Sequence, residues 1–155
     1  FICRVFSCHD YRQTMQDGFS VAKLVAFHSR YKFLVMAHSP SAYRTLGRLV
    51  AQAKLFAPDE LCQRYLLELM QALKNIATRK QHTNVLQHLQ GFLKHGLTAS
   101  AKQELLDLIH RYRQGFIPLM APLTLLQHHL KQYPNAYISA QRYFSPYPEN
   151  LGLRA

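Results

Sequence analysis

One stretch of the chain, residues 82–94, separates its apolar and polar side chains onto different sides of a helix. At 3.6 residues per turn a single apolar stripe forms, made of Val85, Leu86, Leu89, Phe92 and Leu93. A neighbouring face holds Asn84, His88 and Gly91, with His95 one turn further on. Packing explains the stripe, but it does not require a carboxamide, an imidazole or a mid-helix glycine, which costs about 1 kcal/mol relative to alanine. The polar face therefore indicates a binding site.

Comparable groups of apolar residues recur at helical spacing along the whole chain, and they predict an all-α fold. Ser20 is a suitable N-cap, Pro58 suits a first helical turn, and Gly115 suits a helix end. No pair of alternating segments predicts a β-hairpin. The expected helices cover about residues 2–16, 21–37, 41–54, 58–76, 82–94, 100–114 and 122–130.

Local details of two helices can also be predicted. Ser39 or Ser41 is expected to cap the third helix, because a serine hydroxyl accepts a hydrogen bond from a free N–H of the first turn. Ser100 and Gln103 match the spacing of a capping box. Gly47, in the middle of its helix, would permit a close crossing by another helix.

The C-terminal part of the chain has a different composition. Residues 133–148 are rich in Tyr and Pro, and Pro146 and Pro148 exclude a long helix there. The 155 residues match one ordinary domain, which buries roughly two thirds of its unfolded surface. We therefore expect a single domain over residues 1–155, built as a compact bundle of about seven helices with an extended Tyr/Pro-rich C-terminal tail.

Composition excludes several classes of protein. No apolar run reaches the length of about 20 residues that spans a bilayer, and no secretory signal is visible. The chain opens on Phe1 rather than Met, so we expect it to have been trimmed or cut from a longer polypeptide. Cys3, Cys8 and Cys62 contain no CxxC pair, which argues against a disulfide framework and a zinc site. We expect a cytoplasmic protein with no metal or cofactor of its own and no membrane partner.

Charge is the strongest global signal. Nineteen Lys and Arg residues face eight Asp and Glu residues, which gives a formal net charge of +11. Residues 18–58 and 69–103 contain no acidic residue, although both segments carry several Lys and Arg residues. One such segment alone is usually a solvated face, but two of them in a small domain raise the local potential and attract a polyanion. Nucleic acid is the partner that this charge favours.

Catalytic motifs are scarce. The chain contains no HExxH, no GxSxG and no glycine-rich phosphate loop, and its few carboxylates make a paired acid–base site improbable. A histidine general base with an arginine anion clamp needs no carboxylate. A small enzyme acting on a nucleotide or modified base is therefore an alternative, with its catalytic residues unknown.

RNA binding uses the side chains that this chain does contain. Arg and Lys contact phosphates, His and Tyr stack on unpaired bases, and Asn and Gln read base edges. We expect His82, Asn84 and His88 to form a specific pocket with Arg113, unless Asn84 and His88 are buried polar groups that satisfy loop carbonyls. The candidate RNA-binding residues are His28, Arg30, Tyr31, Lys32, His38, Arg48, Arg79, Lys80, His82, Asn84, His88, Arg113, Gln141 and Arg142.

Short blocks spread over almost the whole chain form a specific combination. They are FHSRYK (27–32), AHS (37–39), YRTLG (43–47), HTNVL (82–86), YRQG (112–115), PL (118–119), QRY (141–143) and LR (153–154). This combination resembles the YbgA-like domain family of bacteria, long catalogued as a domain of unknown function. Members of that family occur alone or fused behind a cysteine-rich module that looks like the TudS-type thiouracil desulfidases.

The resemblance implies a role beside a desulfidase. TudS-type enzymes use an iron–sulfur cluster to remove sulfur, and fused forms are implicated in de-modifying 4-thiouridine in tRNA. The cluster cysteines belong to that other module, and Cys3, Cys8 and Cys62 do not reproduce their pattern. The resemblance therefore implies an accessory domain that holds tRNA or another RNA for a desulfidase module in cis or in trans. A protein-interaction domain that docks the desulfidase is the remaining alternative.

Overall fold

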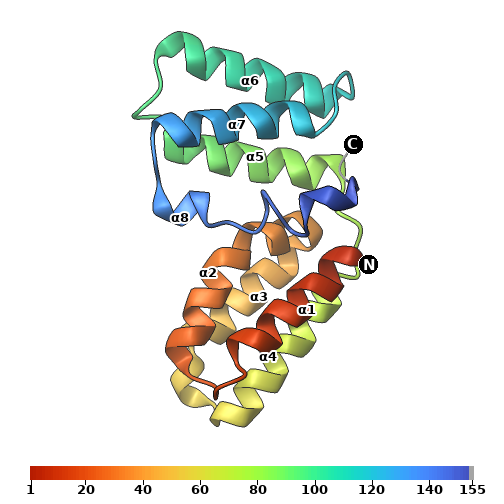
Figure 1. Ribbon diagram of the computed structural model, residues 1–155, viewed down its shortest axis with the longest axis vertical. Helices are drawn as coiled ribbons and strands as arrows, with labels where there is room; N and C mark the ends of the chain where they lie inside the picture. The colour runs from red at the N-terminus through yellow and green to blue at the C-terminus, as the bar shows by residue number, and fades with distance from the viewer. Residues whose placement is uncertain (154–155) are drawn as a thin grey trace. The chain divides into compact units, whose positions relative to one another are not determined.

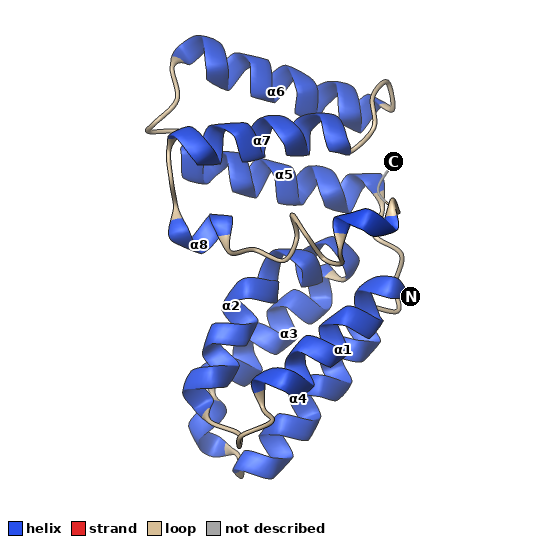
Figure 2. Ribbon diagram, viewed as in Figure 1, coloured by secondary structure: helices blue, strands red, loops and turns tan. Residues whose placement is uncertain are grey.

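The structure is a computed structural model, and it describes residues 1–153. All regular elements in this range are helical (Figure 2), so the predicted all-α fold class is confirmed. Arg154, in the last block of the family resemblance, lies outside the described residues. The α-helices are α1 (Ile2–Thr14), α2 (Val21–His38), α3 (Pro40–Ala51), α4 (Pro58–Ala72), α5 (Arg79–Leu93), α6 (Ala99–Gln114), α7 (Met120–Gln132) and α8 (Ala136–Ser139), and the 3-10 helices are η1 (Ala53–Leu55) and η2 (Glu149–Leu151).

The chain divides into two compact units, which are described separately. The first unit consists of residues 1–77 and 141–148, so it contains α1 to α4 and part of the Tyr/Pro-rich tail. The second unit consists of residues 78–140 and the segment from Glu149 onward, so it contains α5 to α8 and η2. Figure 1 labels the helices of both units. In neither unit is a described helix both long and apolar enough to cross a membrane.

Aromatic rings fill the core of the first unit. Tyr11 and Tyr65 stack with ring centroids 5.6 Å apart, and Phe27 and Tyr31 stack at 4.2 Å. A buried phenol needs a hydrogen-bond partner, because an unsatisfied hydroxyl costs about 1–3 kcal/mol. The Tyr11 hydroxyl donates to the Cys62 carbonyl at 2.8 Å, and the Tyr65 hydroxyl is hydrogen-bonded to His28 Nδ1 at 2.9 Å. Burial raises the pKa of both phenols, so they stay neutral in this core.

The segment 141–148 belongs to the first unit through contacts with α2. The Gln141 side-chain amide donates to the Ser29 carbonyl at 2.6 Å, and the Arg142 N–H donates to the Arg30 carbonyl at 2.9 Å. Tyr143 is fully buried in the same segment. Side-chain and backbone hydrogen bonds therefore hold the tail against α2. Gln141 and its partner Ser29 are 112 residues apart in the sequence.

The second unit packs α5 against α6 and α7. Leu86 and Leu89 of α5, Leu105 of α6 and Leu126 of α7 have no exposed surface. Val85 and Leu93 of the predicted stripe are also buried. The prediction was wrong for one member, because Phe92 is 46% exposed and contacts Tyr137 at 5.7 Å between ring centroids.

The N-cap residues that the structure shows can be compared with the predicted ones. Ser20 accepts from the Lys23 N–H and Ser39 accepts from the Ala42 N–H, as expected. The α6 prediction was wrong, because Thr98 is the N-cap and Ser100 lies inside the helix.

Two further glycine and cap positions were not as expected. Thr78 and Gln81 form a capping box at the start of α5, which is earlier than the predicted start near residue 82. Gly47 has nothing within 4 Å of a built Cβ, so no helix crosses closely there.

Candidate nucleic-acid interface

One exposed face of α5, continued by the two residues that follow the helix, carries polar side chains and no acid. We call it the α5 polar face, and it consists of the exposed residues Lys80, Asn84, Gln87, His88, Lys94 and His95. The four positions within the helix, Lys80, Asn84, Gln87 and His88, lie within about one third of its circumference, because each residue advances the helix by about 100°. Lys94 and His95 follow directly after the last helical residue, Leu93. The predicted exposure of Asn84 and His88 is confirmed, and the alternative of a buried polar pair does not apply.

Gly91 lies in the middle of this face. It is exposed, and nothing in the described structure comes within 4 Å of a Cβ built on it. No helix-packing contact therefore explains a glycine that lowers helix stability by about 1 kcal/mol relative to alanine. A glycine there leaves a flat spot between Asn84, His88 and Lys94, which lets a ligand approach the backbone of α5.

His82 does not belong to the α5 polar face. It precedes Asn84 by two residues, which places it about 160° around the helix from that carboxamide. It is half-buried, whereas Asn84 and His88 are exposed. The grouping of His82 with Asn84 and His88 was therefore wrong in geometry.

Arg79 has a structural role at the junction of α5 and α6. Its Nη1 donates to the Tyr112 carbonyl at 3.2 Å, and its guanidinium lies 5.5 Å from the centre of the Tyr112 ring. Gly115 ends α6 with a φ of 88°, and a Cβ built on it would lie 2.5 Å from Arg79 Nη1. The start of α5 and the end of α6 are thus adjacent. Arg79, Lys80 and Arg113, all exposed, form a basic end of this unit.

The 14 candidate residues separate by burial. His28, Tyr31 and Gln141 are buried, and their side chains form hydrogen bonds inside the first unit. Arg30, Lys32, His38, His82 and Arg142 are half-buried. The exposed candidates are Arg48, Arg79, Lys80, Asn84, His88 and Arg113.

His28 illustrates why a basic residue type does not identify a surface position. Desolvation, reinforced by the positive charge of Lys32, lowers its pKa to about 4. His28 is 7% exposed, and its ring is hydrogen-bonded to Tyr65, which has no exposed surface. His28 is neutral near pH 7 and contributes to the core. His38 likewise has an intramolecular partner, since its Nδ1 lies 2.7 Å from the Asn75 carbonyl oxygen.

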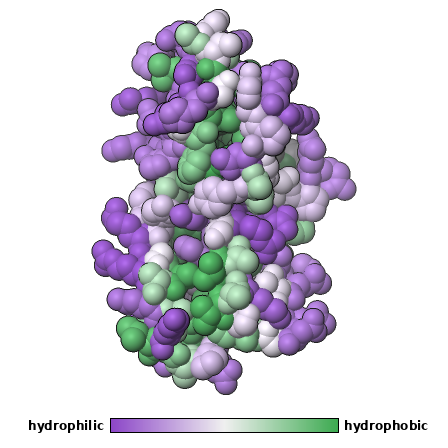
Figure 3. Space-filling model, turned by 90° about the vertical axis from the view of Figure 1, so that its left-hand side faces the viewer, coloured by the Kyte–Doolittle hydropathy of each residue, from purple (hydrophilic) through white to green (hydrophobic). Residues whose placement is uncertain are grey.

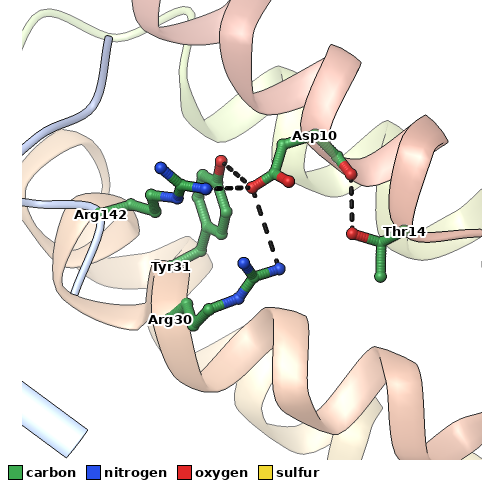
Figure 4. Close-up of polar contacts among 5 residues, drawn as sticks. All are labelled: Asp10, Thr14, Arg30, Tyr31 and Arg142. Atoms are coloured by element: carbon green, nitrogen blue, oxygen red, sulfur yellow. Dashed lines mark hydrogen bonds and ion pairs between the residues drawn. The ribbon is translucent and has the colours of Figure 1, made fainter. Parts of the chain in front are cut away.

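Asp10 gathers three of the candidates into one cluster (Figure 4). Its Oδ2 accepts a hydrogen bond from the Tyr31 hydroxyl at 2.8 Å and forms ion pairs with Arg142 at 3.5 Å and Arg30 at 3.9 Å. The cluster joins α1, α2 and the segment 141–148. Two guanidinium groups face one carboxylate, which leaves a formal charge of +1 on a partly exposed surface. Burial is the main reason that the pKa of Tyr31 is raised, so its hydroxyl stays a donor.

The first unit also presents unpaired basic residues. Arg44 and Arg48 are exposed and one turn apart on α3, and neither forms an ion pair or hydrogen bond through its side chain in the described part of the chain. Thr45 is exposed beside them. Arg48 was a candidate, and Arg44 was missed although it follows the same helical spacing.

Two further observations concern possible metal ligands and the hydropathy of the surface. Among residues 1–153, no three His, Cys, Asp or Glu side chains gather closely enough to hold a metal ion. On the face drawn in Figure 3, hydrophilic side chains cover much of the area and hydrophobic ones show between them.

Comparison with known proteins places the chain in a family. A family model described as "Protein of unknown function (DUF1722)" matches residues 32–148, which is most of the chain. The chain belongs to the DUF1722 family. It is also 36% identical over 154 residues to the protein described as "Uncharacterized protein YbgA" of Escherichia coli (strain K12), covering 99% of this chain and 91% of that protein. The YbgA-like resemblance read from the sequence is therefore confirmed. No solved structure gives a significant match.

Two parts of the DUF1722 surface were not found from the sequence. Gln87 and Lys94 extend the α5 polar face, and helical spacing from Asn84 could have found both. Asp10 could not have been found in this way. It is an isolated acid in α1, and its partners Arg30 and Arg142 come from distant parts of the sequence.

Proposed function

We propose that this DUF1722 chain is an RNA-binding domain, with tRNA as its RNA, and that the α5 polar face is its principal contact surface. The observation that carries the proposal is an exposed helix face with lysines near both ends, Asn84 and His88 between them, and no acid. Lysines bind phosphates without regard to sequence, and Asn and His side chains can contact the edges and faces of unpaired bases.

The surrounding charge supports the same proposal. Arg79 and Arg113 lie at the α5–α6 junction beside Lys80, and the whole chain carries a formal charge of +11. From Lys80 to Lys94 the face extends about 21 Å, because a helix rises about 1.5 Å per residue. A strand lying along it would meet positive charge at each end and hydrogen-bonding groups in the middle.

The second half of the proposal concerns the biological partner. The resemblance to domains that accompany TudS-type desulfidases supports a role in thiouridine desulfuration of tRNA, with the iron–sulfur chemistry in the partner module. A cytoplasmic location fits both the RNA and the odd number of cysteines. Co-purification of the chain with a TudS-type desulfidase, tested with and without RNase, distinguishes a direct protein contact from an RNA bridge.

The first experiment is a tRNA titration of the full chain at several salt concentrations. We expect binding at low salt and a linear fall of log K with log salt, because the lysines release counterions from the phosphates that they neutralise. Lys80→Ala is expected to reduce the magnitude of that slope by about 1. Asn84→Ala is expected to weaken binding and leave the slope unchanged, because a carboxamide neutralises no phosphate.

The matched control is Arg12→Ala. Arg12 is an exposed cation on α1 that lies between Asp10 and Asp17 in the sequence, outside the acid-free segments. Its removal lowers the net charge by the same amount as Lys80→Ala. An equal loss of affinity in both variants would mean that only net charge matters, and the proposed face would be wrong. Absence of tRNA binding at low salt would refute the function itself.

A further inference from the structure

A pocket of about 340 Å³ lies within the first unit, beside the Asp10 cluster. It is formed by one side of α1, by Tyr31 of α2 and by the end of the 141–148 segment. The side chains that matter for its chemistry are Phe6, His9, Asp10, Gln13, Arg142 and Tyr147. None of the RNA-contact residues on α5 belongs to it.

Three types of side chain line the pocket: aromatic, cationic and hydrogen-bonding. Phe6 and Tyr147 are half-buried aromatic residues that line it. Arg142 supplies a guanidinium whose side chain is 42% exposed. His9 and Gln13 are exposed on α1, and their side chains form no hydrogen bond within the described part of the chain. Aromatic, cationic and hydrogen-bonding groups are thus present together in one small space.

Asp10 adds a hydrogen-bond acceptor to the lining of the pocket. Tyr31, Arg30 and Arg142 all contact Asp10 through its Oδ2 (Figure 4). Because these three contacts are made through Oδ2, we expect Oδ1 to accept a hydrogen bond from an N–H of a ligand. The carboxylate is held in one orientation by the same three groups, which makes it a pre-oriented acceptor.

We infer that this pocket binds a single ribonucleotide unit, unstacked from the RNA that the proposed function requires. A base presents a flat ring and a hydrogen-bonding edge, and unpaired bases are recognised by stacking on aromatic side chains and by bonds to that edge. Phe6 and Tyr147 can stack on the base ring, and Asp10 and Gln13 can form hydrogen bonds with its edge. Arg142 can form an ion pair with the phosphate. The inference rests on the proposed RNA binding and names what one nucleotide of that RNA does.

The size of the pocket argues for one nucleotide. Ligand pockets in proteins span roughly 300–1,000 Å³, and this one is at the lower end of that range. The formal charge of the Asp10 cluster is +1, which tolerates one phosphate and offers no further cation inside the pocket for a second. A dinucleotide or a folded helix would have to lie outside.

The direct test uses nuclear magnetic resonance of the ¹⁵N-labelled full chain titrated separately with UMP, CMP, AMP, GMP, ribose 5-phosphate and inorganic phosphate. At least one nucleoside monophosphate is expected to shift the amides of residues 6–13 and 145–147 in a saturable way. Ribose 5-phosphate is expected to bind about tenfold more weakly, because it has no base to stack. Equal binding of inorganic phosphate and of all four nucleotides would overturn the base-recognition half of the inference.

Variants localise the binding. Gln13→Ala and Tyr147→Ala are expected to weaken nucleotide binding about tenfold or more, whereas Arg12→Ala, next to the pocket on α1 and not lining it, is expected to leave it unchanged. Gln13 is exposed, so its loss leaves the core intact, and circular dichroism checks the fold of each variant. Unchanged nucleotide affinity in both pocket variants would overturn the site.

A parallel measurement of tRNA binding distinguishes failure of this inference from failure of the proposed function. If tRNA binds and no nucleotide binds even at millimolar concentration, the pocket inference is wrong and the α5 proposal stands. If nucleotides bind and tRNA does not, the pocket is a free-nucleotide site and its link to RNA is overturned. Support requires that Gln13→Ala weaken tRNA binding as well, with no change in its salt slope.

Discussion

The buried His28 makes the stability of the first unit depend on pH. The residue is 7% exposed, and desolvation together with the charge of Lys32 lowers its pKa from the usual 6.5 to about 4. In the unfolded chain the imidazole takes a proton near pH 6.5, whereas in the folded core it does so only near pH 4. The unfolded state therefore binds more protons between these values, and stability falls as the pH is lowered through that window.

The magnitude follows from the two pKa values. Each tenfold difference in proton affinity is worth about 1.4 kcal/mol, so His28 accounts for a full loss of about 3 kcal/mol below pH 4. Between pH 7 and pH 5 the expected loss is about 2 kcal/mol. This is a large fraction of the stability of an ordinary domain, which is about 5–15 kcal/mol.

Urea unfolding at pH 7 and pH 5, followed by far-ultraviolet circular dichroism, measures this effect. His28→Gln is expected to be less stable than the parent at pH 7, because it removes the imidazole that is hydrogen-bonded to Tyr65. It is expected to lose about 2 kcal/mol less than the parent between the two pH values. His9→Gln, which replaces an exposed histidine of α1, is the matched control. If the parent and His28→Gln lose the same free energy between pH 7 and pH 5, His28 is not the neutral core residue described above.

Three further substitutions test the structure in other ways. Gly91→Ala is expected to stabilise the chain by about 1 kcal/mol in thermal melting, because nothing lies near the added methyl. The same change is expected to weaken tRNA binding in a titration, and an unchanged affinity would show that no ligand approaches the helix there. Arg79→Ala is expected to cost about 1 kcal/mol in urea unfolding through the lost bond to Tyr112, whereas Lys80→Ala leaves the melting temperature unchanged. Asp10→Ala is expected to cost about 2 kcal/mol, because the buried Tyr31 hydroxyl loses its acceptor, and equal stability of the variant and the parent would contradict the described cluster.

The division of roles among the basic residues has a consequence for mutagenesis. Arg79 is a candidate contact and also an anchor of the α5–α6 junction, so loss of RNA binding in Arg79→Ala has two explanations. Lys80 and Asn84 are exposed, and their side chains make no hydrogen bond or ion pair in the described residues. They are therefore the cleaner positions at which to test the function.

Periodicity and end signals predicted the seven longer helices α1 to α7, but they missed the short α8, which lies in the segment that was expected to be extended. The apolar spacing of Val85, Leu86 and Leu89 sets the buried side of α5, because side chains three and four residues apart share one side of a helix. The same rule predicted that Asn84 and His88 lie on another side. It should also have excluded His82, since two residues correspond to more than half a turn.

Long-range packing was beyond the reach of these local rules. His28 and His88 are the same residue type in similar basic surroundings, yet one is buried against Tyr65 and the other is exposed, because burial depends on which neighbouring helix covers a given face. Arg142 meets Asp10 across most of the length of the chain, and no spacing rule relates residues that far apart. The order of residues therefore sets which side of each helix is apolar, whereas the pocket beside Asp10 exists only because folding brings α1, α2 and the 141–148 segment together.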